Sequence, residues 1–378
     1  MGKFDRYMLS QLLVIFSFSS IVLVLVYWIN RAVRLFDWLI ASGQSATVFL
    51  EFTALTLPNV IRLVLPISAF AATVYVTNRL SSESELVTVQ ATGYSPGRLA
   101  RPVVVFGLIV AAFVSALVHF AVPASLSRLA ARQVEISENV TARLLVEGQF
   151  VHPADDLTLY IREITPQGEL RDIFLRDTRS EEQDVIYTAT RALIVNGPDG
   201  PRFVMRDGKA QTVQIETLNL AVTSFGEFAF DLSTLLGDFD LAQAGRLRIS
   251  HLSTPDLLRP TPRLIAETRS SAADMRLEGH QRFTIALMSV AVPLIGFATL
   301  LLGGFSRFGI WNQIFGAIAL IVLLQVADNA IIDLALARPE LWGLIYTPGL
   351  VGLALGLLLL WLAANPQVYR RRRSEGSA

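Results

Sequence analysis

The 378-residue sequence contains no cysteine. This excludes disulfides, thiolate zinc sites and iron–sulfur clusters, and it fits any cellular compartment. Charge is also scarce, because charged residues make up 17% of the chain, against about a quarter in soluble domains. Basic and acidic residues number 32 each, so the formal net charge is zero. No overall basic field therefore points to nucleic acid as a partner.

Motifs for catalysis are missing as well. There is no GxxxxGK[ST], so the chain has no P-loop and cannot hydrolyse ATP by that route. There is no HExxH, and the four histidines are scattered without metal-ligand spacing. The stretch Gly93–Gly97 matches GxSxG, but that hydrolase elbow requires a strand before the serine and a histidine partner. The sequence therefore predicts a non-catalytic chain without a metal or cofactor of its own.

Long apolar runs are abundant, and 52% of the residues are hydrophobic. A helix that crosses a bilayer of about 30 Å needs roughly 20 mostly apolar residues. Six runs meet that length: 11–29, 59–77, 102–122, 283–303, 310–336 and 343–363. The first run is too long for a signal peptide and lacks a small-residue cleavage site, so we expect it to be a retained helix. The layout predicts an α-helical membrane protein with three spans before and three after a large polar insert.

The distribution of Lys and Arg in the short loops predicts the orientation. With the N-terminus in the cytoplasm, the inner segments hold ten such residues: Lys3, Arg6, Arg79, Arg98, Arg101, Arg307 and Arg370 to Arg373. The short outer loops hold only three: Arg31, Arg34 and Arg338. We therefore expect both termini in the cytoplasm and the insert outside.

The insert, residues 124–280, reads as a β domain flanked by helices. A helix is predicted from Ser125 to Leu145, and helical spacing returns from Ser250 to His280. Between them, near 146–236, short strand-like runs are separated by turn signals such as Asp207-Gly208. These runs are 148–151, 157–162, 170–176, 185–189, 192–195, 202–205 and 209–215. The pattern predicts an all-β sandwich or roll. The domain boundaries are then 1–123 for the first three spans, 124–280 for the insert, and 281–378 for the last three spans with a basic tail.

The loop between the second and third spans predicts a short helix near residues 82–92. Ser82 and Glu85 have the spacing of a capping box. Gly93 suits a C-terminal cap, and Pro96 follows as a stop. Acidic Glu83 and Glu85 would lie near the positive end of this helix. The alternative is an ordinary solvated connection, since charged faces usually meet only water.

Ionisable groups inside predicted spans are costly and often functional. In span five Gln325, Asn329 and Asp333 share one helix face, and Asp328 lies deeper. We expect that face to point to protein or to a wet cavity, although Asp333 is close enough to the interface to be simply hydrated.

Three arginines are predicted at the outer surface of the membrane. Arg31 and Arg34 lie just beyond span one, and Arg62 lies at similar depth in span two. Arginine suits bidentate phosphate binding. The alternative is ordinary snorkelling to the interface.

In the order and content of its motifs, the chain resembles the LptF/LptG permease family of the lipopolysaccharide exporter. The resemblance covers nearly the whole chain and rests on four segments: 4–7 (FDRY), 84–95 (SELV…ATGYS), 148–150 (GQF) and 278–282 (EGHQR). The opening residues and the run 78–85 look more like the LptF branch than the LptG branch. Gly279 departs from the family pattern, which often has a bulkier residue there.

The resemblance implies a transport subunit that is driven by ATP hydrolysis on a separate partner chain. Such permeases pair with a paralogue of LptG type on an LptB-type ATPase dimer, which binds the ATP. Residues 82–92 would be the coupling helix that contacts the ATPase through Glu83, Glu85, Leu86 and Val89, with Glu85 as the family's acidic contact. Spans one and five would form the lateral gates.

The resemblance also implies a route for lipopolysaccharide through the inner membrane of a Gram-negative bacterium. Arg31, Arg34 and Arg62 would hold lipid phosphates. A periplasmic β-jellyroll, lined by Phe150, Leu159 and Ile161, would pass lipid to LptC- and LptA-type jellyroll proteins by offering a sheet edge. Two alternatives stay open: a subunit of another ABC-type lipid or lipoprotein transporter, or a membrane scaffold or receptor that moves nothing.

Overall fold

A computed structural model describes residues 2–365, apart from 42–45, 145–146, 155, 166–167, 181, 198–199, 216, 218, 232–246 and 303–310. The chain divides into two compact units. Unit 1 comprises residues 1–31, 54–126 and 247–378, and unit 2 comprises residues 32–53 and 127–246.

Six helical segments of the described residues are long and apolar enough to cross a membrane, which confirms the predicted spans. They are Lys3–Asn30, Thr47–Ser82, Pro96–Gln133, Ala272–Leu302, Trp311–Ala337 and Pro339–Ala364. The elements that form them are α1 (Lys3–Ala41), α2 (Ala46–Ser82), α4 (Pro96–Leu99), α5 (Arg101–Ala116), η1 (Leu117–Ala121), α6 (Val122–Leu144), α9 (Ala272–Leu302), α10 (Trp311–Ala337), η5 (Pro339–Tyr346) and α11 (Thr347–Ala364). Four of the six segments extend beyond their apolar runs at both ends, because the neighbouring residues continue the backbone hydrogen bonding of the helix.

Small residues let α11 lie close to α9. A Cβ atom built on Gly352 would lie 3.1 Å from Ala291 Cβ of α9 and 2.9 Å from Leu324 Cδ2 of α10. One built on Gly356 would lie 2.9 Å from Leu294 Cγ. Gly352 and Gly356 form a GxxxG pair, the pattern that allows helix backbones to approach within a membrane. The pair therefore serves packing.

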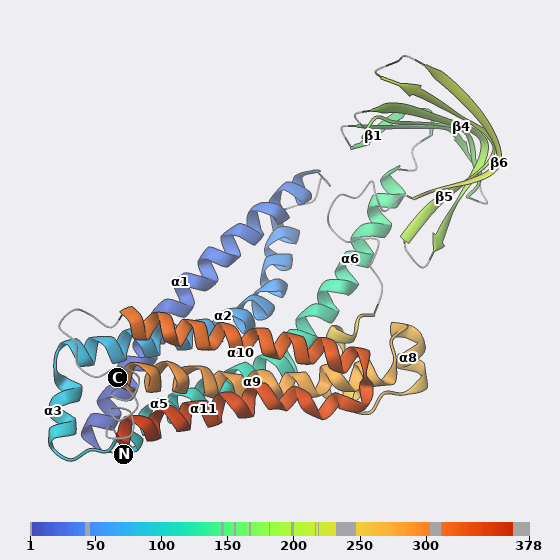
Figure 1. The fold of residues 1–378 in the computed structure, drawn as a ribbon. Coiled ribbons are helices and arrows are strands. Elements are labelled where there is room, and N and C mark those ends of the chain that lie inside the picture. The colour runs from blue at the N-terminus through green and yellow to red at the C-terminus, as the bar shows by residue number, and fades with distance from the viewer. Residues whose placement is uncertain are drawn as a thin grey trace. The chain divides into compact units, whose positions relative to one another are not determined.

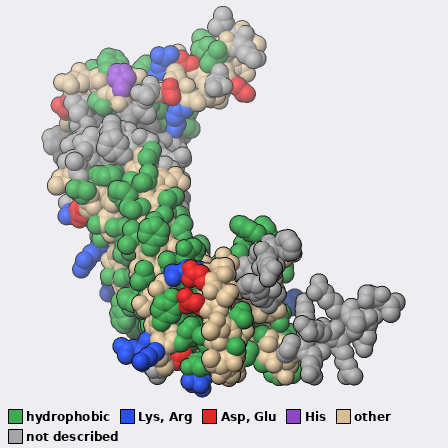
Figure 2. Space-filling view, turned by 90° about the vertical axis from the view of Figure 1, so that its left-hand side faces the viewer, with side chains coloured by type: hydrophobic (Ala, Val, Ile, Leu, Met, Phe, Trp, Pro, Cys, Tyr) green, Lys and Arg blue, Asp and Glu red, His purple; other side chains and the backbone are tan. Residues whose placement is uncertain are grey.

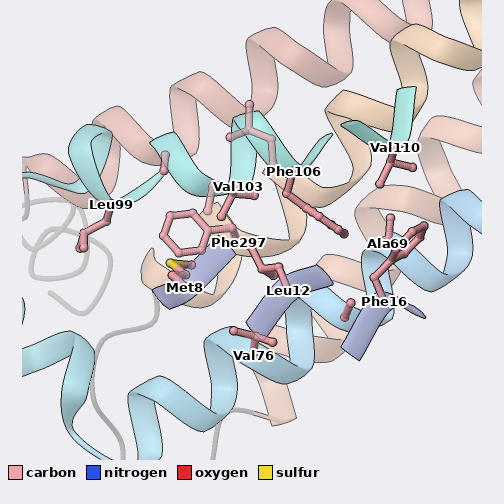
Figure 3. Close-up of a cluster of buried hydrophobic side chains, with 14 of the residues drawn as sticks. Met8, Leu12, Phe16, Ala69, Val76, Leu99, Val103, Phe106, Val110 and Phe297 are labelled. Carbon is pink, nitrogen blue, oxygen red and sulfur yellow. The ribbon is translucent and has the colours of Figure 1, made fainter. Parts of the chain in front are cut away.

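The core of unit 1 joins the first three spans to α9 (Figure 3). It contains fully buried side chains of α1, α2, α4, α5 and α9: Met8, Leu12, Ala69, Val76, Leu99, Val103, Phe106, Val110 and Phe297. The rings of Phe16 and Phe106 meet edge to face with centroids 5.4 Å apart.

Apolar side chains also cover much of the helix surface (Figure 2). The span windows of α1 and α10 are the least covered by the rest of the chain, with 17% and 11% of their residues buried. Phe18 and Leu323 are more than 60% exposed. Hydrocarbon, unlike water, accommodates such a surface without penalty.

Unit 2 contains one antiparallel sheet whose described strands follow in sequence order, and the sheet is strongly curled (Figure 1). The strands are β1 (Phe150–Ala154), β2 (Leu157–Ile164), β3 (Leu170–Asp177), β4 (Gln183–Gly197), β5 (Gly200–Gln214) and β6 (Leu220–Asp231). A separate β domain is thus confirmed, in the form of a roll and not a two-sheet sandwich. Two predicted breaks are wrong, since 185–189 and 192–195 belong to β4, and 202–205 and 209–215 belong to β5. Strand β6 was not predicted.

Candidate functional site

The predicted short helix after the second span exists as α3 (Glu85–Ala91), but it begins differently. The capping box is wrong: α2 continues to Ser82, whose hydroxyl donates to the carbonyl of Arg79. Glu83 lies in the turn, and its carboxylate is 3.1 Å from Arg79 Nε in an i,i+4 pair. Ser84 caps α3 with a φ of 61° and no side-chain hydrogen bond. Glu85 is therefore the acidic residue in the first turn of α3.

One side of α3 is fixed to the core of unit 1. Leu86 is 3% exposed and belongs to the same cluster as Met8, Leu80 and Leu99. Val89 packs against this cluster as well. The expectation that Leu86 faces a partner is therefore corrected, because it is covered by its own chain. Leu86 and Val89 seat the helix.

The start of α1 supports α3 and the following turn. The hydroxyl of Tyr7 lies 3.5 Å from a Glu85 carboxylate oxygen. The ring of Phe4 meets that of Tyr94 edge-on at 6.5 Å, and the Arg98 guanidinium lies 4.0 Å above the Tyr94 ring. The other face of α3 is open, and its exposed residues are Val87, Thr88, Gln90 and Ala91. Sequence reasoning missed this face because a seven-residue helix has too little pattern to show which side is buried.

The structure tests the predicted basic group only in part. The side chains of Arg31 and Arg34 lie outside the described residues. Arg62 is half-buried on α2, and its Nε atom has no hydrogen-bond partner within the described part of the chain. The proximity of the three arginines therefore stays a prediction.

A buried polar network in unit 1 was not predicted. Arg282 of α9 is 3% exposed, and its Nη1 donates to the Thr254 hydroxyl at 3.0 Å. The same hydroxyl lies 2.9 Å from His119 Nδ1. His119 lies in η1, a π-helical turn where α5 passes into α6, and such turns often mark functional positions. Glu278 Oε1 lies 3.9 Å from Arg282 Nε. The signal in the sequence was an arginine directly before the fourth apolar run.

Three residues of the predicted polar group on α10 contact one another, and no such contact of Asp333 is seen among the described residues. The Gln325 amide nitrogen lies 3.5 Å from Asp328 and 3.4 Å from Asn329. Within this chain Gln325, Asn329 and Asp333 are exposed and Asp328 is half-buried. What this face meets in the membrane stays a prediction.

The two faces of the sheet in unit 2 differ sharply. Leu159 and Ile161 are 1% exposed and belong to one apolar cluster on the inner face. Phe150 is 62% exposed, and its ring lies 4.8 Å from that of Tyr160 and 6.2 Å from that of Phe174. Because Phe150 is paired directly with Tyr160, both point to the face opposite Leu159. The expectation that Phe150 lines the interior is therefore wrong.

The chain matches known proteins along most of its length. The family model described as "Lipopolysaccharide export system permease LptF/LptG" matches residues 6–362. An uncharacterized protein of Rickettsia prowazekii is 23% identical over 351 residues, which cover 92% of this chain and 94% of that protein. The lipopolysaccharide export system permease protein LptF of Escherichia coli K12 is 24% identical over 230 residues, which cover 61% of this chain and 57% of LptF. The membrane helices, the separate β domain and this match together show that the chain belongs to the LptF/LptG family of lipopolysaccharide export permeases.

Proposed function

We propose that this chain is an LptF-type permease subunit that takes lipopolysaccharide from the outer leaflet of the inner membrane and passes it to a periplasmic β-jellyroll bridge. It would pair with an LptG-type paralogue on an LptB-type ATPase dimer, which binds and hydrolyses the ATP. Both termini and α3 would lie in the cytoplasm, and unit 2 in the periplasm, beside LptC- and LptA-type proteins.

The observation that carries this proposal is the construction of α3. One face is fixed to the core through Leu86, and that core contains residues of α1, α2, α5 and α9. A push on the open face, which includes Val87, would therefore be transmitted to several spans at once. Such a helix suits a chain that is moved by a separate nucleotide-binding partner, because closure needs a partner that binds the two states differently.

Family membership and the apolar inner face of unit 2 support a lipid as the cargo. The cluster around Leu159 and Ile161 offers hydrocarbon contacts of the kind that acyl chains need. Arg31, Arg34 and Arg62 are the proposed phosphate contacts. The polar face of α10 around Asp328 would line the shared cavity or meet the paralogue.

The first test addresses coupling. Glu85→Arg reverses a charge at the start of α3 without changing the buried Leu86, so we expect normal folding and loss of lipid export. Val87→Asp should weaken recovery of the ATPase with the chain by at least tenfold. Glu83→Arg is the matched control, because Glu83 already faces Arg79 and should have the smaller effect. Normal export by a stably inserted Glu85→Arg variant would exclude the coupling role.

The second test addresses cargo and partners together. Photo-crosslinking residues placed at 31, 34, 62 and 159 in living cells should capture glycolipid. Purification of the tagged chain should recover an ATPase and a second six-span protein. Another ABC-type transporter predicts the ATPase but a different crosslinked molecule, and a scaffold predicts neither.

A further inference from the structure

The inner side chains of unit 2 skip one position in five neighbouring strands. In an ordinary strand every second residue points to the same face. Here each strand from β2 to β6 has one point at which two residues, and not one, separate successive inner positions. The intervening pairs are 162–163, 171–172, 190–191, 206–207 and 226–227. Each of these strands therefore contains one extra residue.

These extra residues form a single line across the sheet. One row of directly paired inner residues is Ile161, Ile173, Ala189, Gly208 and Phe225, and the next is Ile164, Leu170, Ala192, Met205 and Phe228. The pairing between the described strands is interrupted at the same place each time. We call this line the crease, and the parts on either side of it the two half-sheets.

The backbone and the charges both mark the crease. Asp172 has a φ of 47° and Asp207 a φ of 54°, left-handed values that aspartate tolerates better than most residues. Ion pairs join neighbouring strands along its outer side: Arg162 with Asp172, Arg191 with Asp207 at 3.0 Å, and Arg206 with Glu227 at 3.2 Å. All of these side chains are more than 40% exposed. Exposed pairs are weak, so the outer side offers little resistance to bending.

The bend brings the two half-sheets into contact. Tyr187 lies five positions before Ala192 on β4, and Ala192 shares a row with Phe228. In a flat sheet those rows would be about 16 Å apart. The rings of Tyr187 and Phe228 nevertheless stack with centroids 5.0 Å apart and planes 12° apart. Phe230 also meets Tyr187, at 5.7 Å.

The inner face is closed in this state. Leu175 and Met205 are 0% exposed and Phe203 is 1% exposed, so an acyl chain has no surface to contact unless side chains separate. We propose that the crease is a hinge, and that the Tyr187–Phe228 contact must part before an acyl chain of the transported lipid reaches the inner face. This inference rests on the proposed lipid transport.

The absence of cysteine allows a direct lock. Tyr187→Cys with Phe228→Cys, in the full chain produced with its partner subunits, can be joined by a short thiol crosslinker that is cleaved by reduction. We expect locking to reduce lipid photo-crosslinking at position 159 at least tenfold. Crosslinking at position 31 should persist, and reduction should restore the signal at 159.

Thr188→Cys with Lys209→Cys is the matched control. These two residues are directly paired within one half-sheet, so joining them should leave crosslinking at 159 unchanged. Equal lipid at 159 in the locked and reduced forms would overturn the hinge. Lipid at 31 but never at 159 would overturn passage over the inner face and the hinge with it, and lipid at neither position would overturn the proposed transport.

A second measurement needs no lipid and no ATPase. In a Met205→Cys chain, Phe228→Ala should speed maleimide labelling at position 205 by at least tenfold, because the closing ring is gone. Labelling of Thr188→Cys, on the outer face, should not respond to Phe228→Ala. Equal rates at position 205 with and without Phe228 would refute the closure.

Discussion

The helices of unit 1 and the sheet of unit 2 achieve close packing in opposite ways. Between α9 and α11 the close contact depends on the lack of a side chain at Gly352, where neighbouring atoms leave no space for a Cβ. On the inner face of the sheet it depends on large side chains such as Phe203, which fill the curl. Unit 1 should therefore resist added volume, and unit 2 should resist removed volume. The difference fits the roles proposed above, unit 1 as a rigid transmitter and unit 2 as an enclosure that opens.

The largest effect should follow removal of volume from unit 2. Phe203→Ala should lower the free energy of unfolding of the sheet by about 3–5 kcal/mol, as other buried Phe→Ala changes do. Phe150→Ala is the control, because its side chain is 62% exposed and should cost much less. Thermal unfolding followed by the β signal in circular dichroism measures both. Equal effects would mean that the two faces are not distinct.

The next effect should follow addition of volume to unit 1. Gly352→Leu has to displace Leu324 and Ala291, and overpacking typically costs about 1–3 kcal/mol. Gly343→Leu is the control, since a Cβ there meets nothing within 4 Å. Melting temperatures of the two variants in detergent should differ clearly. Equal melting temperatures would mean that close packing around Gly352 contributes little to the stability of unit 1.

The two units should lose stability at different acidic pH values. Burial, aided by Arg248, holds the pKa of His251 in unit 1 below its ordinary 6.5. The neutral form therefore stabilises the fold above pH 6.5, and that contribution is lost as the pH falls through the folded pKa. In unit 2 the hydrogen bond from Arg179 holds the pKa of Asp177 below 3.8, so its contribution persists until more acidic pH. Unfolding scans between pH 8 and 3 should show unit 1 weakening first, and His251→Asn should reduce that step.

The smallest effect should come from the outer side of the crease. Arg191→Gln removes an exposed pair with Asp207, and such pairs contribute about 0.2–1 kcal/mol. Lys209→Gln, also on an exposed position of β5, serves as the reference. A loss above about 2 kcal/mol in denaturant unfolding would show that the pairs hold the crease shut, against a freely bending hinge.

Much of this architecture could be predicted from the sequence, because lipid imposes a length on apolar runs that few other structures share. The ends of the elements could not. The polar end of α2 runs on through Arg79 and Glu83, so the apparent capping box at Ser82 became a helix end. The Asp207-Gly208 pair does favour a turn, and Asp207 has a left-handed φ. Pairing with the neighbouring strands nevertheless keeps this segment within β5, where it forms part of the crease. Strand β6 was missed because Gly226 and Glu227 interrupt its alternation.

The sequence allowed the residues of the candidate site to be located, but not the face on which each side chain lies. Glu85 could be placed at a short helix, whereas only packing against Met8 shows that Leu86 faces inward. Likewise Phe150 was expected on the inner face. Its pairing with Tyr160 on β2, which the sequence does not show, places it on the outer face. The burial of Arg282 could not be predicted, because burial of a charged residue depends on partners such as Thr254, which lie far away in the sequence.

The sparsely covered helices α1 and α10 offer a way to detect neighbours without isolating them. Fluid hydrocarbon adapts to any apolar shape, whereas a protein surface accepts only complementary ones. In a saturation mutagenesis screen, positions such as Phe18 and Leu323 that face lipid should tolerate exchange among Leu, Ile, Phe and Met. A band of positions that refuses such exchanges would trace the footprint of another polypeptide along each helix.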